Sequence, residues 1–154
     1  MTKNVAKCLI DKPPVDFAHL AKLFVREYSK DSRRGYGANV VDVFHKLRGS
    51  KFDDVYKPAR EQFSGSGSYG NGGAMRIAPV SLFFHKDYEA MLDAAKNVTE
   101  LTHTNRLGVH GALLQCIAVH QSLQLDPDIK VNHVEYVAKL IDKMKKIEVA
   151  DDYK

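Results

Sequence analysis

The spacing of apolar residues constrains the fold of this chain more than any other feature. Apolar side chains recur three, four, seven and eight residues apart over long stretches, as on one face of an α-helix. In the clearest case they follow Asp16, a typical helix N-cap, and comprise Phe17, Leu20, Ala21, Phe24, Val25 and Tyr28. Strands would instead alternate apolar and polar residues, and no convincing stretch does so. The spacing therefore predicts an all-α fold of packed helices.

Glycine, proline and polar runs divide this pattern into segments. We expect helices over residues 2–10, 17–28, 38–47, 87–101, 104–123 and about 131–149. Lys12-Pro13-Pro14 is expected to stop the first helix, Pro58 to interrupt a shorter one, and Pro79 to kink or end a buried one. The last helix has as its expected apolar positions Val134, Val137, Ala138, Ile141 and Met144. At 154 residues, without a long linker or internal repeat, residues 1–154 are expected to belong to a single domain.

Composition and charge exclude several classes of protein. No apolar run approaches the roughly 20 residues of a membrane span, and the first residues lack the apolar core of a signal peptide. Cys8 and Cys116 lie far apart in helical segments, so we expect free thiols in an intracellular protein. The net charge of +4 favours a phosphate or nucleic-acid partner. The densest basic group is interleaved with acids and is typical of a solvated helix face, so direct DNA binding is not expected; it comprises Lys139, Lys143, Lys145 and Lys146.

The segment from Phe63 to Gly73 is rich in glycine and serine and passes directly into an apolar stretch. Gly65, Gly67 and Gly70 match the spacing of a dinucleotide-binding fingerprint, but that motif follows a strand, and none is expected here. Bare glycine backbone can approach a ligand closely, and a helix is expected to begin where the run ends, which favours phosphate. The alternative is a flexible surface loop. The apolar continuation favours a loop anchored against the core.

Two longer stretches carry a resemblance. GSYGNGGAMRIAP (residues 67–79) and LTHTNRLGVHGALLQCIAVH (residues 101–120) resemble the ADP-ribosylglycohydrolase family, whose members are all-α magnesium enzymes with orthogonally packed helices. RGYGANVVDVFHKL (residues 34–47) and residues 58–76 are similar to its third branch, which removes ADP-ribose from serine and degrades poly(ADP-ribose). The resemblance implies a hydrolase whose partners are ADP-ribose, ADP-ribosylated proteins and poly(ADP-ribose). It also implies a monomeric intact enzyme, a role in the DNA damage response and a nuclear, cytoplasmic or mitochondrial-matrix location.

The resemblance also implies individual substrate contacts. The diphosphate and adenosine side of ADP-ribose falls on one loop, formed by Ser66, Gly67, Ser68, Tyr69, Gly70, Asn71 and Gly72. Ser66 departs from the branch, which usually has lysine there. Phe63 matches a residue lining the adenine end, and Gly35 matches a glycine near the distal ribose. His103 matches a histidine that contacts the ligand, whereas its residue type alone would favour a capping or core role. His110 and His120 lack metal-ligand spacing and are expected to be structural.

The metal ligands of the family are missing from these residues. Cleavage of a glycosidic bond needs an activated water and charge stabilisation. The family uses two Mg²⁺ ions for this, held by an early glutamate and two aspartate motifs, none of which is present. Asp53-Asp54 instead suits a helix N-terminus, and Asp151-Asp152 is expected to fray.

We therefore expect no catalytic residue and no metal ligand in this chain. We interpret it as a central fragment of the family's domain, inactive alone, with exposed apolar faces that promote self-association. Two alternatives stay open: a short product that binds ADP-ribose without catalysis, and a basic helical interaction module.

Overall fold

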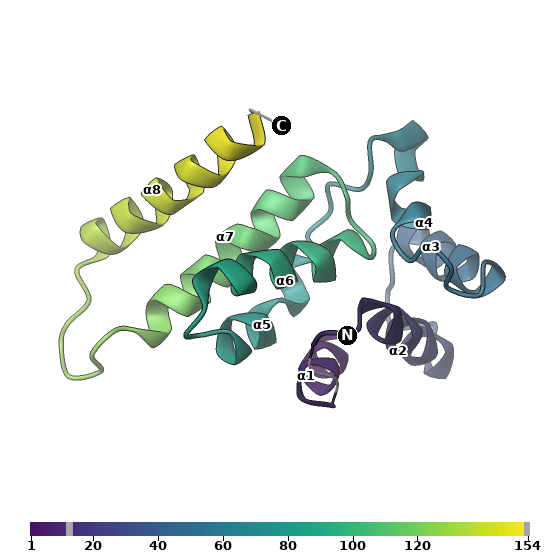
Figure 1. Ribbon diagram of the computed structural model, residues 1–154, viewed down its shortest axis with the longest axis horizontal. Coiled ribbons are helices and arrows are strands. Elements are labelled where there is room, and N and C mark those ends of the chain that lie inside the picture. The colour runs from purple at the N-terminus through teal and green to yellow at the C-terminus, as the bar shows by residue number, and fades with distance from the viewer. Residues whose placement is uncertain (12–13, 153–154) are drawn as a thin grey trace.

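The computed structural model describes residues 1–11 and 14–152, and within them it contains helices and no strands (Figure 1). The predicted all-α class is confirmed. The α-helices are α1 (Thr2–Asp11), α2 (Phe17–Lys30), α3 (Ala38–Gly49), α4 (Lys57–Arg60), α5 (Ala78–Phe83), α6 (Tyr88–Glu100), α7 (Arg106–Leu123) and α8 (His133–Asp152). Of two short 3₁₀ helices, η1 (Gln62–Gly65) overlaps the start of the glycine-rich segment and η2 (Ala74–Arg76) follows its end. Lys12 and Pro13, expected to stop α1, lie outside the described residues.

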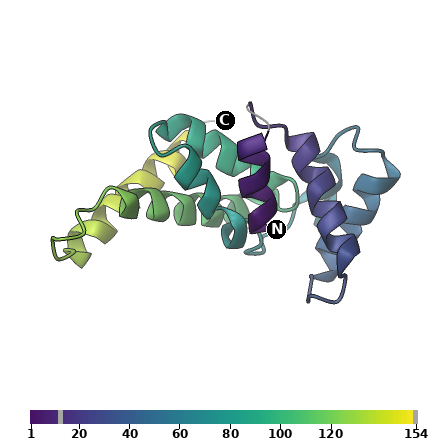
Figure 2. The same ribbon diagram turned by 90° about the horizontal axis from the view of Figure 1, so that it is seen from below.

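Helix α7 is the centre of the arrangement. It packs against α5, α6, η2 and α8, while α1 joins α5 to α2, and α2 contacts α3. In Figure 1, α8 therefore lies on one side of α5–α7 and α2–α4 lie on the other; Figure 2 shows the same order from below. The largest fully buried side chains come from six of these helices, the residue before α5 and the residue after α6, and include Phe24, Phe44, Leu20, Ile77, Met91 and Ile117. Cys8 and Cys116 are buried free thiols, as predicted.

Capping side chains set the starts of three helices. Asp16 accepts a hydrogen bond from the backbone N–H of His19, so the predicted N-cap of α2 is confirmed. Asp87 does the same for α6, and Asn105 for α7. Each side chain satisfies one of the N–H groups that a helix start leaves without a partner.

The prediction for Pro58 was wrong, whereas the break expected near Pro79 is present, at Ile77. Pro58 lies in the first turn of α4, and Pro79 in the first turn of α5. In both places proline starts a helix, because the first turn does not need the missing N–H and favours the fixed φ of the ring. The expected break before Pro79 falls earlier, between η2 and α5.

Of the five apolar positions predicted for α8, only Met144 packs against the core. Leu140, Met144 and Ile147 lie against the core, whereas Val134 is 80% exposed and Ile141 is 48% exposed. The helix carries two apolar stripes, and only one of them faces α7. No helix in the described ranges is both long enough and apolar enough to span a membrane.

Candidate functional site

The glycine-rich segment is an anchored loop that lies on the junction between α6 and α7. The Asn105 side chain donates a hydrogen bond to the Ser66 carbonyl over 2.9 Å, and the Gly67 N–H donates to the Gln62 carbonyl over 3.0 Å. A Cβ added to Gly108, in the first turn of α7, would lie 2.9 Å from the Ser68 carbonyl oxygen. These contacts fit the anchored loop and not the flexible alternative.

Backbone conformation explains two of the glycines. Gly65 and Gly67 have φ values of +91° and +70°, in the left-handed region that favours glycine. Phe63 and Ser64 adopt the same region with φ values of 51° and 56°, although side chains make it costly by roughly 1–2 kcal/mol per residue. The chain is therefore strained where it enters the loop.

Close packing explains two further glycines. A Cβ on Gly72 would lie 2.9 Å from Nε2 of His103, and one on Gly70 would lie 3.2 Å from the same atom. Neither residue has a left-handed φ. The absence of a side chain at these positions therefore makes room for the ring of His103. From the sequence, that room had been expected to serve a ligand.

Two predicted site residues form an aromatic pair at one side of the loop. The rings of Phe63 and Tyr69 have centroids 6.4 Å apart, with an angle of 36° between their planes. Phe63 is 48% exposed and Tyr69 is 70% exposed. Exposed aromatic faces in this arrangement can stack with a planar base.

The polar groups of the loop divide into engaged and open ones. The Ser66 hydroxyl donates to the Phe63 carbonyl over 2.8 Å, and the Ser68 hydroxyl accepts from the Gly70 N–H over 3.3 Å. Within the described chain, no hydrogen bond engages the backbone N–H of Tyr69, Asn71 or Gly72. Three donors within four residues can therefore serve an anion.

His103 lies beneath the loop and is only 8% exposed. Its backbone N–H donates to the Thr99 carbonyl at the end of α6, and its Nδ1 lies 2.7 Å from the Thr102 hydroxyl. Burial, and secondarily the positive charge of Arg76, lower the pKa of His103 to about 4. The ring is therefore neutral at physiological pH. His103 is therefore a buried core residue, as its residue type alone would favour, and its ring also packs against the loop.

Gly35 is not part of this group. It lies in the turn between α2 and α3, and a Cβ built on it would meet no atom within 4 Å. The Gln62 side chain links the loop region to α3 through the Asn39 carbonyl, over 2.8 Å. The remaining predicted residues come together at the α6–α7 junction.

Acidic residues do not form a metal site. Among residues 1–11 and 14–152, no group of three or more His, Cys, Asp or Glu side chains could hold a metal ion. Asp54 accepts from the backbone N–H groups of Tyr56 and Lys57 at the start of α4, as predicted. Asp151 was expected to fray, but it lies within α8 and its carboxylate is 2.8 Å from Nε2 of His110.

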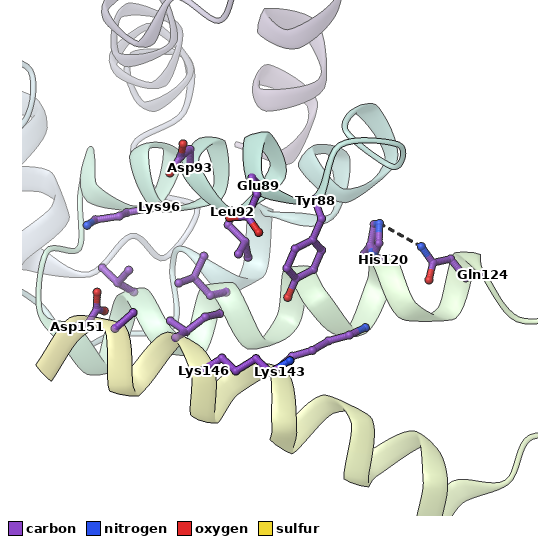
Figure 3. Close-up of a pocket in the computed structure, with 14 residues that line it drawn as sticks. Tyr88, Glu89, Leu92, Asp93, Lys96, His120, Gln124, Lys143, Lys146 and Asp151 are labelled. Atoms are coloured by element: carbon purple, nitrogen blue, oxygen red, sulfur yellow. Dashed lines mark hydrogen bonds between the residues drawn. The ribbon is translucent and has the colours of Figure 1, made fainter. Parts of the chain in front are cut away.

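A cavity of about 680 Å³ lies between α6, α7 and α8, away from the loop (Figure 3). Tyr88 from α6 and Lys143 and Lys146 from α8 line it, above an apolar floor that includes Leu113. Lys143 also donates to the Gln121 side chain over 3.0 Å. None of the predicted site residues lines this cavity, so it is separate from the candidate site.

Sequence reasoning missed Arg76 and Thr102. Both are buried, and the guanidinium Nη2 lies 2.8 Å from the Thr102 hydroxyl, which in turn contacts His103. The available signal was an arginine inside the apolar segment after the glycine run, because an arginine there must find buried partners.

Comparison with known proteins gives a family match over nearly the whole chain. A family model described as ADP-ribosylglycohydrolase matches residues 1–153. ADP-ribosylhydrolase ARH3 of Gallus gallus is 45% identical over 152 residues, which cover 99% of this chain and 40% of that protein. The proteins of the same name from Mus musculus and Homo sapiens are 48% and 47% identical over 124 residues, which cover 80% of this chain. The chain thus spans between 33% and 40% of the length of these three relatives.

Proposed function

The chain belongs to the ADP-ribosylglycohydrolase family, and we propose that its glycine loop forms the ADP-ribose-binding part of a hydrolase acting on O-glycosidic ADP-ribose linkages. The proposed substrates are ADP-ribosyl-serine in proteins and poly(ADP-ribose). The observation that carries this proposal is the loop itself: in the described chain the backbone N–H groups of residues 69, 71 and 72 make no hydrogen bond, and the same loop carries Tyr69, whose exposed ring pairs with that of Phe63. The name of the relatives, ADP-ribosylhydrolase, supports the same substrate class.

The parts of the loop match the parts of ADP-ribose. The adenine stacks on Phe63 and Tyr69, since aromatic faces accept any base without sequence preference. The diphosphate accepts hydrogen bonds from the backbone N–H groups of Asn71 and Gly72. Because these donors belong to a loop fixed on α7, little ordering cost is added when the ligand binds.

The chain's own contribution is binding and orientation. The magnesium ions that we propose for the complete domain need clustered oxygen ligands, and the described residues offer no such cluster. We therefore assign no catalytic step to this chain. Binding of ADP-ribose without hydrolysis is the second candidate function, and the same observation favours it for the 154-residue chain alone. An intracellular location and a monomeric complete enzyme stay predictions.

An NMR titration of the 154-residue chain with ADP-ribose tests the binding proposal. Each neutral polar contact contributes only about 0.5–1.5 kcal/mol net, so we expect a high-micromolar to millimolar Kd. Shifts should concentrate at residues 66–72. Tyr69→Ala should weaken binding at least about 5-fold, since stacking contributes about 1–3 kcal/mol per base. Lys143→Ala, in the separate cavity, is the control and should leave the Kd unchanged. Shifts confined to residues 139–146 would contradict the proposal.

Activity separates the two candidate functions. The purified chain, with added Mg²⁺, should release no ADP-ribose from a serine-modified peptide, because the family's metal ligands are absent from its sequence. Turnover that depends on Mg²⁺ and stops with a chelator would show that this chain contains metal ligands after all.

A further inference from the structure

We propose that Arg76 and Thr102 are positioning residues that hold His103 in the neutral form with its proton on Nε2, so that this N–H donates a hydrogen bond to a ligand oxygen in the glycine loop. The ligand in this statement rests on the proposed function. The proton's place on the ring rests on hydrogen bonds within the chain and can be tested without any ligand.

The Thr102 hydroxyl determines which ring nitrogen carries the proton. A guanidinium only donates hydrogen bonds, so Thr102 Oγ1 accepts from Nη2 of Arg76 over 2.8 Å. The hydroxyl proton then has His103 Nδ1 as its acceptor, 2.7 Å away. If Nδ1 carried the proton instead, Thr102 Oγ1 could accept from both donors, but its own hydroxyl proton, on a residue that is 1% exposed, would find no acceptor in the described structure. Nδ1 is therefore the acceptor and Nε2 carries the proton.

Arg76 is held rigidly, so it can fix the Thr102 hydroxyl. Its side chain is 4% exposed, and its guanidinium lies over the ring of Phe24, 4.8 Å from the centroid. The two N–H groups of Nη2 are shared among Thr102 Oγ1 and the carbonyls of Val98 and Thr99, which lie 2.7 and 3.3 Å away, so one N–H is bifurcated; the buried Nε has no partner in the described structure. These carbonyls belong to the last turns of α6, the end of a helix that favours a cation. In the described part of the chain no carboxylate forms an ion pair with Arg76. Its positive charge is therefore stabilised by these carbonyls and by the Thr102 hydroxyl.

The geometry places the Nε2 proton at the loop. A Cβ on Gly72 would approach Cε1 to 2.5 Å and Nε2 to 2.9 Å, and one on Gly70 would approach Nε2 to 3.2 Å, so the end of the ring that carries Nε2 faces both glycines. Among the described residues, no protein group accepts from Nε2. Arg76 also disfavours a second proton on the ring, since its charge contributes to the lowered pKa of His103. His103 can therefore offer a neutral N–H donor beside the open backbone donors of Asn71 and Gly72.

Ring-nitrogen NMR of the full chain, labelled with ¹⁵N, tests the tautomer directly. At pH 7 the wild-type His103 ring should show a protonated Nε2 and an unprotonated Nδ1. Thr102→Val removes the hydroxyl at nearly constant volume and should give a mixture of the two neutral forms. Thr99→Val is the matched control, because that buried hydroxyl bonds only the Ala95 carbonyl of its own helix, over 2.8 Å. Thr102→Ser keeps the hydroxyl and should restore the wild-type pattern.

The same variants test the link to the ligand. Thr102→Val should weaken ADP-ribose about 3- to 10-fold, the value of one hydrogen bond, while Thr99→Val and Thr102→Ser stay within about 2-fold of wild type. A proton on Nδ1 in the wild type, or a ring unchanged by Thr102→Val, would overturn the inference. Equal affinity despite an altered ring would overturn the donor role of His103. If the wild type binds no ADP-ribose, the proposed function fails, while the ring spectra still decide the tautomer.

Discussion

The glycine loop is packed more closely against the rest of the chain than helix α8 is, although their sequences suggest the reverse. The loop has no regular structure, yet backbone contacts and the buried ring of His103 hold it to α6 and α7. Helix α8 is 20 residues long, yet no described side chain on it is fully buried. It is attached by one partly buried apolar stripe and by polar bonds to α7, such as Tyr136 to the Ala118 carbonyl and Lys143 to Gln121.

This difference teaches that helical periodicity and firm attachment are separate properties. A helix gains most of its stability in a protein from the apolar face that it buries. Helix α8 buries one stripe incompletely and leaves Val137 and Ile141 about half exposed. A glycine-rich loop can be the firmer of the two, since close backbone packing leaves it little freedom. Substitutions that act on one region and not on the other can break or sharpen this comparison.

The largest effect is expected from Gly67→Ala in the loop. Alanine is strained at a φ of +70°, and its Cβ would lie 2.6 Å from the backbone nitrogen of Asn105, which cannot move without shifting α7. The free energy of unfolding should fall by at least about 2 kcal/mol, as measured by denaturant titration. Gly111→Ala is the control: it meets no atom within 4 Å in the middle of α7 and should raise stability by about 0.5–1 kcal/mol. Equal effects of the two would mean that the loop is not anchored.

A smaller effect is expected from pH, acting through His103. The pKa of this histidine is about 4 in the folded chain and ordinarily about 6.5, so the unfolded chain binds more protons between these values. The free energy of unfolding should therefore fall by about 1–3 kcal/mol as the pH drops from 6.5 to 4. His103→Gln should remove this drop, whereas His133→Gln, at the exposed start of α8, should not. A drop of the same size in His103→Gln would assign it to other groups.

The smallest effect on stability is expected at the outer face of α8. Ile141→Glu should change the free energy of unfolding by less than about 0.5 kcal/mol, because the side chain is half exposed. The same change should reduce self-association in sedimentation velocity, since it places a charge in the exposed apolar stripe. Lys145→Gln lowers the net charge by the same amount at an already polar position, so it serves as the control. If both variants sediment like wild type, this stripe is not where copies of the chain meet.

Most of the fold could be predicted from the sequence. Apolar spacing located the long helices, and Asp16 marked the start of α2, because both signals depend on residues close together in the chain. Pro58 was misread, because the rule that proline interrupts a helix does not apply in its first turn. The packing face of α8 could not be predicted, because both of its stripes are apolar and only tertiary contact selects one.

The candidate site was only partly predictable, because its residues come from separate segments. The glycine run and the resemblance indicated the loop and His103. The hydrogen bond between Thr102 and Arg76 joins residues 26 positions apart, and no local pattern encodes it. For Gly70 and Gly72 the sequence correctly indicated that a side chain has no room. The expected reason, close approach of a ligand, was incomplete, since the atom nearest to an added Cβ belongs to His103.

The contacts of the glycines have a consequence for how such a chain evolves. A descendant that no longer met its ligand would still be selected to keep Gly67, Gly72 and Gly108, because folding alone demands them. Retention of the glycine run in a distant homologue therefore indicates common ancestry and the same fold, and it is weak evidence that the homologue binds the ligand. The exposed ring of Tyr69 is not needed for folding in the same way. Substitution at that position is therefore the earlier sign that a homologue has lost ligand binding.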